Sequence, residues 1–203
     1  MKKAVIITAG AGLLIAAYLI LWPEPRIRNT DPPEGAIICF GDSLTFGTGS
    51  SPGMDYPSQL SRLIGMPVLN AGRPGDMTGD ALERLERDVL SLSPGIVFIT
   101  LGGNDLKNRG SRREAFDNLK KIIERIQDKG ALVVVGGIDV PLFDLGFPGE
   151  YVRVCRETGA VLIPDIYDGI FGRGELMSDP IHPNDRGYQI IAERFYAAVK
   201  PYL

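Results

Sequence analysis

Residues 36–45 read AIICFGDSLT, an apolar run that leads straight into a polar cluster. The run Ala36–Phe40 has no polar interruption, which is typical of a strand buried on both faces of a parallel sheet. Further apolar runs of this kind are bounded by glycine, proline or asparagine, and they span residues 67–69, 96–101, 131–135 and 160–163. The sequence therefore predicts five short strands.

Amphipathic segments alternate with these runs. Apolar side chains recur at helical spacing in two of them, at Leu82, Leu85, Val89 and Leu92, and at Ala115, Leu119, Ile122, Ile123 and Ile126. Two more helices are expected near residues 56–64 and 185–199. Strands and helices that alternate in this way form right-handed crossovers. The predicted fold class is α/β, a three-layer sandwich with a mostly parallel five-stranded sheet.

Length and composition limit the class of protein. A chain of 203 residues with 44% apolar content can bury one substantial core, which indicates a single domain. The net charge of −3 lacks the basic footprint of a nucleic-acid-binding protein. We expect the two cysteines, Cys39 and Cys155, to be unpaired, and Cys39 to point into the core rather than act as a nucleophile.

The N-terminal segment has the pattern of a membrane anchor. Residues Ala4–Trp22 carry no charge, and as a helix they would span about 28 Å, close to the ~30 Å core of a bilayer. We therefore expect an anchor or uncleaved signal at 1–22, a proline-rich linker at 23–35 and a domain at 36–203. Lys2 and Lys3 favour a cytoplasmic N-terminus with the domain outside, although Arg26 and Arg28 on the other flank count against this orientation.

The chain holds one histidine, His182. A serine hydroxyl attacks an acyl carbon only when an imidazole takes its proton and a carboxylate orients that imidazole. Ser43, His182 and Asp179 are the residue types that supply these three roles. Asp179 lies three residues before His182 in a turn with two prolines, so its carboxylate can fold back onto the ring. Taken alone, this segment is more typical of a plain turn before a helix than of a catalytic site.

Four polar clusters follow predicted strands. Ser43 follows the first, residues 70–72 the second and residues 102–105 the third, while His182 comes after the last strand. Ligands of open parallel sheets bind at the carboxyl ends of the strands, where the strand order reverses. The sequence thus predicts one site at this edge.

Four short motifs carry a family resemblance: GDSLT at 41–45, NAG at 70–72, GGND at 102–105 and DPIHPN at 179–184. They resemble the signature blocks of the SGNH, or GDSL, hydrolases, in the bacterial single-domain branch of esterases, thioesterases and lysophospholipases. The resemblance runs from about residue 36 to the C-terminus. It implies the flavodoxin-like SGNH fold and serine-dependent hydrolysis of carboxylic esters or thioesters through an acyl-enzyme. It also implies a small-molecule substrate and no cofactor or metal.

The resemblance assigns roles by position. Ser43 would be the nucleophile, His182 the general base and then acid, and Asp179 the residue that orients it. The backbone N–H groups of Ser43 and Gly72 and the side-chain amide of Asn104 would hold the oxyanion, since glycine permits close approach and an amide donates without titrating.

Three residues are candidates for substrate binding. Arg73 stands where many relatives have a small or aliphatic residue, and it either favours anionic substrates or is simply solvated. The apolar segment 142–147 contains Phe143 and Phe147, and it is interpreted either as a wall or lid of the acyl pocket or as a packed connection.

Other readings of the sequence remain. Gly49–Gly53 matches the G-x-S-x-G elbow, but Pro52 after Ser51 has no N–H for an oxyanion. A magnesium phosphatase could use Asp42 and Asp105, although this leaves His182 unexplained. An acyltransferase or O-acetylesterase acting on envelope carbohydrate, or a non-catalytic anchored binding domain, are further alternatives. The expected location is the bacterial inner membrane, single-pass with the domain on the periplasmic side, and no obligate protein partner is evident.

Overall fold

Five parallel strands form one sheet in the computed structural model, which describes residues 26–108, 110–139 and 147–203. The strands are β1 (Ala36–Gly41), β2 (Val68–Gly72), β3 (Pro94–Thr100), β4 (Leu132–Gly136) and β5 (Val161–Ile163). Their order is β2-β1-β3-β4-β5, and every neighbouring pair is parallel. The order reverses between β1 and β3, so a crevice is expected at the carboxyl ends of these two strands.

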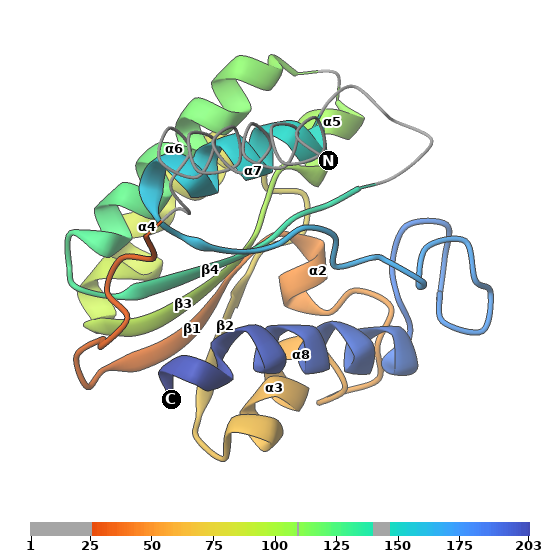
Figure 1. Cartoon of the computed structure of the whole chain (residues 1–203). Helices are drawn as coiled ribbons and strands as arrows, with labels where there is room; N and C mark the ends of the chain where they lie inside the picture. The colour runs from red at the N-terminus through yellow and green to blue at the C-terminus, as the bar shows by residue number, and fades with distance from the viewer. Residues whose placement is uncertain (1–25, 109, 140–146) are drawn as a thin grey trace, which may run out of the picture.

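Helices cover both faces of this sheet (Figure 1). On one face α3 (Tyr56–Ile64) packs against α8 (Asp185–Val199). On the other face α6 (Arg112–Gln127) lies between α4 (Thr78–Asp88) and α7 (Phe147–Thr158). Short 3₁₀ turns at Leu90–Leu92 and Lys200–Tyr202 follow α4 and α8. The predicted α/β three-layer architecture is confirmed.

The strands differ in how far they are buried. Strands β3 and β4 are buried along their whole length, which explains their continuous apolar sequences. Strand β2 lies at the edge and is partly exposed, with Leu69 44% accessible. It is also longer than expected, because residues 70–72 continue the pairing with β1 instead of forming a loop.

Helix α7 was not predicted, and it begins at Phe147, in what we expected to be an apolar loop. The signal was present, because Tyr151, Val154 and Cys155 are buried at helical spacing. Tyr151 also donates its hydroxyl to the Leu101 carbonyl at 2.5 Å. Helix α7 therefore holds the backbone directly after β3 through this hydrogen bond.

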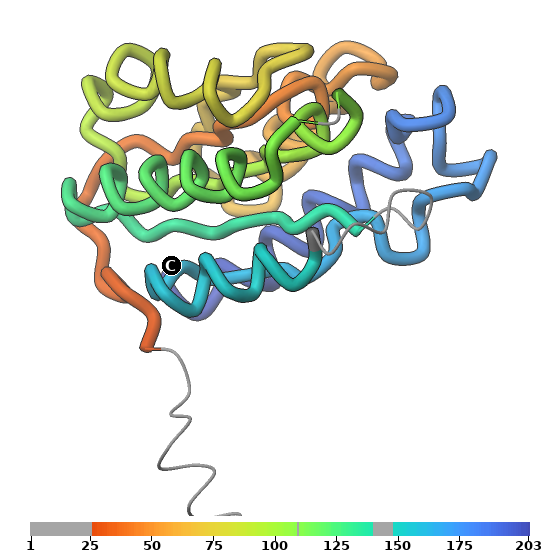
Figure 2. The backbone as a smooth tube through the Cα atoms, turned by 90° about the horizontal axis from the view of Figure 1, so that it is seen from above, coloured from red at the N-terminus to blue at the C-terminus, as the bar shows by residue number. Residues whose placement is uncertain are grey.

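Residues 1–22, the expected anchor, lie outside the described residues. Residues 26–35 belong to the expected linker, and they rest on the domain (Figure 2). The Asn29 amide donates to the carbonyls of Gln127 and Ala131, both at 2.9 Å, and the Arg28 N–H donates to the Gly159 carbonyl at 2.9 Å. Within residues 26–108, 110–139 and 147–203, no helix has the length and apolar character needed to cross a membrane.

Both cysteines are buried and unpaired, as predicted. Burial raises the pKa of the Cys39 thiol well above its usual value and that of Cys155 to about 12. Since the thiolate is the reactive form, neither cysteine is suited to nucleophilic attack.

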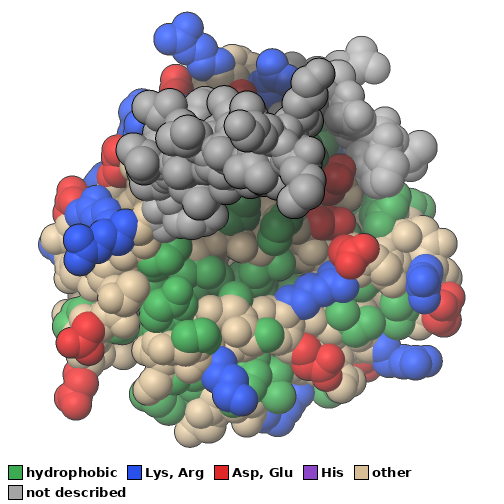
Figure 3. All heavy atoms as spheres, in the orientation of Figure 1, with side chains coloured by type: hydrophobic (Ala, Val, Ile, Leu, Met, Phe, Trp, Pro, Cys, Tyr) green, Lys and Arg blue, Asp and Glu red, His purple; other side chains and the backbone are tan. Residues whose placement is uncertain are grey.

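Charged side chains of both signs share the surface. On the face seen in Figure 3, Lys and Arg are interspersed with Asp and Glu among the described residues. Ion pairs such as Arg125–Glu86 at 3.0 Å and Lys120–Glu157 at 2.7 Å join neighbouring helices. Exposed pairs of this kind contribute about 0–1 kcal/mol each, so they add little to the stability of the fold.

Candidate active site

Ser43, His182 and Asp179 meet at the carboxyl edge of the sheet. The distance from Ser43 Oγ to His182 Nε2 is 3.0 Å, and the distance from His182 Nδ1 to Asp179 Oδ2 is 2.7 Å. Because an ionised carboxylate can only accept, Nδ1 carries the ring proton and Nε2 accepts from the Ser43 hydroxyl. The structure thus brings together three residues that are up to 139 positions apart in the chain.

The turn that carries His182 is shaped by Asp179. Asp179 Oδ1 accepts the backbone N–H groups of Ile181 and His182, both at 2.8 Å, while Oδ2 holds the imidazole. Burial acts to raise the pKa of Asp179, but the hydrogen bonds from His182 and Ile181 outweigh it and lower this pKa below its usual value. Asp179 therefore stays ionised and fixes the tautomer of the ring.

Ser43 is the first residue of the short helix α2 (Ser43–Phe46), directly after β1. Asp42 caps this helix by accepting the Leu44 N–H at 3.0 Å, as expected for an aspartate that positions a loop. Burial, together with the negative charges of Asp76 and Asp105, raises the pKa of Asp42 to about 7. Burial therefore favours the uncharged form of Asp42, directly beside the nucleophile.

Asn104 lies at the start of α5 (Gly103–Lys107), on the other side of the crevice. Its amide donates to the Asp76 carbonyl at 2.9 Å and more weakly to Asp42 Oδ2 at 3.4 Å. The next residue, Asp105, accepts the N–H and the hydroxyl of Thr78 at the start of α4. The amide of Asn104 is thereby held at the pocket that Ser43 and His182 also line.

Gly72, which the resemblance implied as the second oxyanion donor, does not line this pocket. Its N–H already donates to Asn70 Oδ1 at 2.9 Å. A Cβ at this position would lie 2.1 Å from the Phe46 nitrogen. A side chain at position 72 would therefore clash with the backbone of α2, which gives a packing reason for glycine there.

Gly75, three residues further on, differs from Gly72 in its backbone N–H, although it does not line the pocket either. The Asp76 N–H donates to the Arg73 carbonyl at 3.2 Å, and Gly75 has a φ of +88°, so Arg73–Asp76 form a type II turn with Pro74 and Gly75 at its centre. This turn leaves the Gly75 N–H without an acceptor among the described residues. The turn is tied to both sides of the site, because the Arg73 N–H donates to the Gly41 carbonyl and Asp76 accepts from Asn104. The Pro-Gly pair after β2 was the sequence signal for it.

An apolar pocket of about 150 Å³ opens beside Ser43 and His182. Its walls come from several separate loops and helices, and their apolar members are Leu44, Leu106, Ile138, Tyr167, Phe171 and Ile181. No local sequence pattern marks the set, because its members come from five separate segments of the chain. Lys107 adds one cation to the lining.

Of the three residues proposed for substrate binding, Arg73 is not among those that line the pocket. The Arg73 guanidinium is 65% exposed and pairs with Asp76 at 3.6 Å, which agrees with the solvated alternative. Phe143 lies outside the described residues. Phe147 begins α7, and its side chain is not among those described.

Comparisons with known proteins agree with this geometry. A family model described as GDSL-like lipase/acylhydrolase matches residues 39–190. An arylesterase from Vibrio mimicus is 29% identical over 168 residues, which cover 77% of this chain and 84% of that protein. The Escherichia coli K12 protein named thioesterase 1/protease 1/lysophospholipase L1 is 24% identical over 173 residues, covering 81% and 83%.

A crystal structure of TesA superposes on this fold with a TM-score of 0.78 at 25% identity, covering 83% of this chain and 99% of that one. The family model spans the segment from β1 into α8, and this segment contains the nucleophile loop, the Asn104 loop and the His182 turn. On these grounds the chain belongs to the GDSL-like lipase/acylhydrolase family and is a serine carboxylic ester hydrolase.

Proposed function

We propose that Ser43 is the nucleophile of this hydrolase, with His182 as general base and Asp179 as the residue that orients it. The observation that carries the proposal is the contact of 3.0 Å between Ser43 Oγ and His182 Nε2, with Asp179 at 2.7 Å behind the ring. Ser43 Oγ attacks the acyl carbon while its proton moves to His182 Nε2. The protonated imidazole then gives this proton to the departing alcohol or thiol, and an acyl-enzyme remains.

Water completes the cycle by the same route in reverse. His182 takes a proton from the water as its oxygen attacks the acyl carbon, and then returns the proton to Ser43 Oγ as the acid leaves. Both tetrahedral intermediates carry an oxyanion that needs preorganised donors. We assign these donors to the Ser43 N–H, the Asn104 amide and, in place of Gly72, the unpartnered Gly75 N–H.

We expect substrates with short acyl chains. Similar proteins are named arylesterase and thioesterase, and the pocket beside Ser43 is apolar. Its volume of about 150 Å³ is limited, so only the first methylenes of an acyl chain can be buried in it. An acyl chain longer than the pocket leaves its outer methylenes in water, and these methylenes add no binding free energy.

This predicts the outcome of a graded panel of p-nitrophenyl esters and acyl thioesters. The value of kcat/KM should rise about tenfold from acetyl to butyryl, since each buried methylene contributes about 0.8 kcal/mol, and should level off beyond hexanoyl. Phe171→Ala, which enlarges the pocket, should extend the rise to longer chains. Phe46→Ala is the matched control, because Phe46 is 55% exposed and does not line the pocket. A steady rise to dodecanoyl in the unmodified enzyme would contradict the assignment of this pocket.

We further propose that residues 1–22 anchor the enzyme in the bacterial inner membrane as a single span, with the catalytic domain on the extracytoplasmic side. The uncharged run Ala4–Trp22 and the flanking Lys2 and Lys3 support this location. The full chain should sediment with membranes. A version that lacks residues 1–22 should be released and keep its ester hydrolysis, because residues 26–35 pack on the domain and remain in place. Membrane association that persists after this deletion would count against the anchor.

A further inference from the structure

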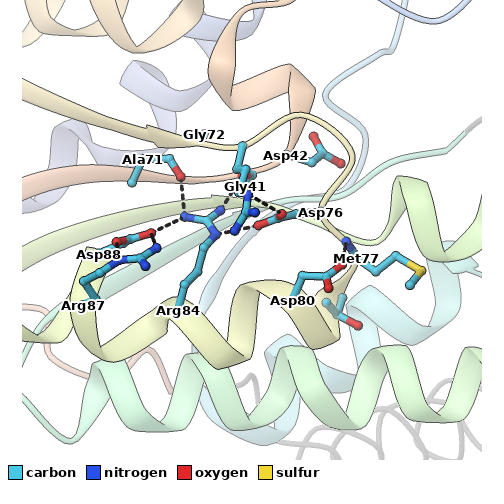
Figure 4. Close-up of polar contacts among 12 residues, drawn as sticks. Gly41, Asp42, Ala71, Gly72, Asp76, Met77, Asp80, Arg84, Arg87 and Asp88 are labelled. Carbon is cyan, nitrogen blue, oxygen red and sulfur yellow. Dashed lines mark hydrogen bonds and ion pairs between the residues drawn. The ribbon is translucent and has the colours of Figure 1, made fainter.

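A buried arginine, Arg84 of α4, lies behind the proposed oxyanion donors. Its side chain is 5% exposed, and its guanidinium donates at 2.9 Å to the Gly41 carbonyl and at 3.0 Å to the Ala71 carbonyl. It also donates through Nε to Asp76 at 2.5 Å and through Nη1 to Asp88 at 3.0 Å. Figure 4 shows this side chain reaching from α4 to the ends of β1 and β2.

Only an arginine can make this set of contacts. The guanidinium presents five donors in one rigid plane, and here they reach two backbone carbonyls and two carboxylates. The same plane lies over the Phe40 ring, 4.4 Å from its centroid. A lysine keeps the charge, but its single nitrogen cannot reach acceptors on both strands and on Asp76 together.

Each backbone carbonyl that Arg84 binds lies just before a segment that carries residues of the proposed active site. The Gly41 carbonyl belongs to the peptide directly before Asp42 and Ser43. The Ala71 carbonyl lies at the end of β2, just before the turn that carries Gly75. Asp76 is the last residue of that turn; its carboxylate accepts from Arg84, and its carbonyl accepts the Asn104 amide at 2.9 Å.

We propose that Arg84 is a positioning residue that sets the nucleophile loop and the Gly75 and Asn104 donors in register with one another. The inference rests on the proposed function, since it assumes that these groups hold the oxyanion. Arg84 does not line the substrate pocket. Its effect therefore falls on the transition state, where the donors must match a developing charge, rather than on the binding of the ester.

The test is steady-state hydrolysis of p-nitrophenyl butyrate by the full chain. Arg84→Lys should lower kcat by about 10- to 100-fold, the cost of misplacing catalytic groups by about 1 Å. KM should stay within about twofold, because ground-state binding is unchanged. Arg87→Lys is the matched control and should leave both constants unchanged, since Arg87 lies on the same helix and pairs with the same Asp88 but is 73% exposed.

A double-mutant cycle with Asn104→Ala separates positioning from a general loss of structure. In the Asn104→Ala background, Arg84→Lys should reduce kcat at least about threefold less than it does alone, because groups that act as a unit are not additive. Equal factors in both backgrounds, an unchanged kcat, or a raised KM at constant kcat would each overturn the inference.

Two further variants distinguish a failure to fold and a failure of the proposed function from a failure of the Arg84 inference. If Arg84→Lys does not fold, as judged by circular dichroism, Asp76→Asn takes its place in the same cycle, because it weakens the grip of Arg84 and keeps the backbone carbonyl that binds Asn104. Ser43→Ala tests the proposed function independently of the cycle. If Ser43→Ala loses activity and the effects of Arg84→Lys and Asn104→Ala are additive, the positioning role of Arg84 is refuted and the proposed function stands.

Discussion

Replacing Ser43 with alanine should reduce kcat for p-nitrophenyl acetate or butyrate by about 10⁴-fold or more. The mutation removes the only oxygen within hydrogen-bonding distance of His182 Nε2 among the described residues, and without it no acyl-enzyme can form. The loss should be nearly as large in His182→Ala, and the double mutant should be no worse than either, because nucleophile and base act as a unit.

The matched control for this prediction is Ser51→Ala. Ser51 is exposed in the loop that matches the G-x-S-x-G pattern, and its backbone N–H donates to Asp185 at 2.6 Å. The alanine variant keeps that contact, so its activity should equal that of the unmodified enzyme. Retention of activity by Ser43→Ala, or its loss in Ser51→Ala, would move the nucleophile elsewhere and end the mechanism proposed above.

Replacing Asn104 with alanine should lower kcat by about 10²- to 10³-fold with little change in KM. Its amide is the only side-chain donor that we assign to the oxyanion, and a donor of this kind acts mainly once the negative charge has developed. Ester hydrolysis and the thermal unfolding midpoint should be measured together, because Asn104 also binds the Asp76 carbonyl.

Asn108→Ala, at the C-terminal cap of the same helix α5, is the control. Among the residues that the structure describes, the Asn108 amide donates to the Met77 sulfur at 3.6 Å and to no group of the proposed site, so its loss should leave kcat unchanged. The backbone donor can be followed by NMR in a phosphonate adduct of Ser43. The amide proton of Gly75 should shift strongly downfield, while that of Gly72, which is bonded to Asn70, should not. A shift at Gly72 alone would restore the original assignment.

Local sequence patterns were sufficient to predict most of the fold. The five strands were recognisable because chains buried between two helical layers need continuous apolar residues, and helices α3, α4, α6 and α8 because each buries a single face. Helix α7 was overlooked because an apolar stretch precedes it, so its start at Phe147 read as part of a loop. The exposure of β2 was not predicted, since a run of three apolar residues reads alike at the edge and in the centre of a sheet.

The site was predictable only in part, because a linear pattern does not contain the contacts between distant residues. Ser43, His182 and Asp179 could be chosen because the chain holds one imidazole, an aspartate lies three residues before it, and the serine lies in a recognisable motif after the first strand. Gly72 was chosen by its motif, whereas its actual constraint is a steric contact with Phe46 that no linear pattern contains. Gly75 became a candidate only when the turn around it was seen to leave its N–H unpaired.

The sequence by itself determined the alternation of strands and helices, the identity of the general base and the membership of a family, because each of these depends on residue type and short-range spacing. Tertiary structure decided which N–H groups remain free, which apolar residues form the pocket, and that Arg84 joins the ends of β1 and β2. These features depend on contacts between residues far apart in the chain, and such contacts are defined only when the sheet and its helices have packed.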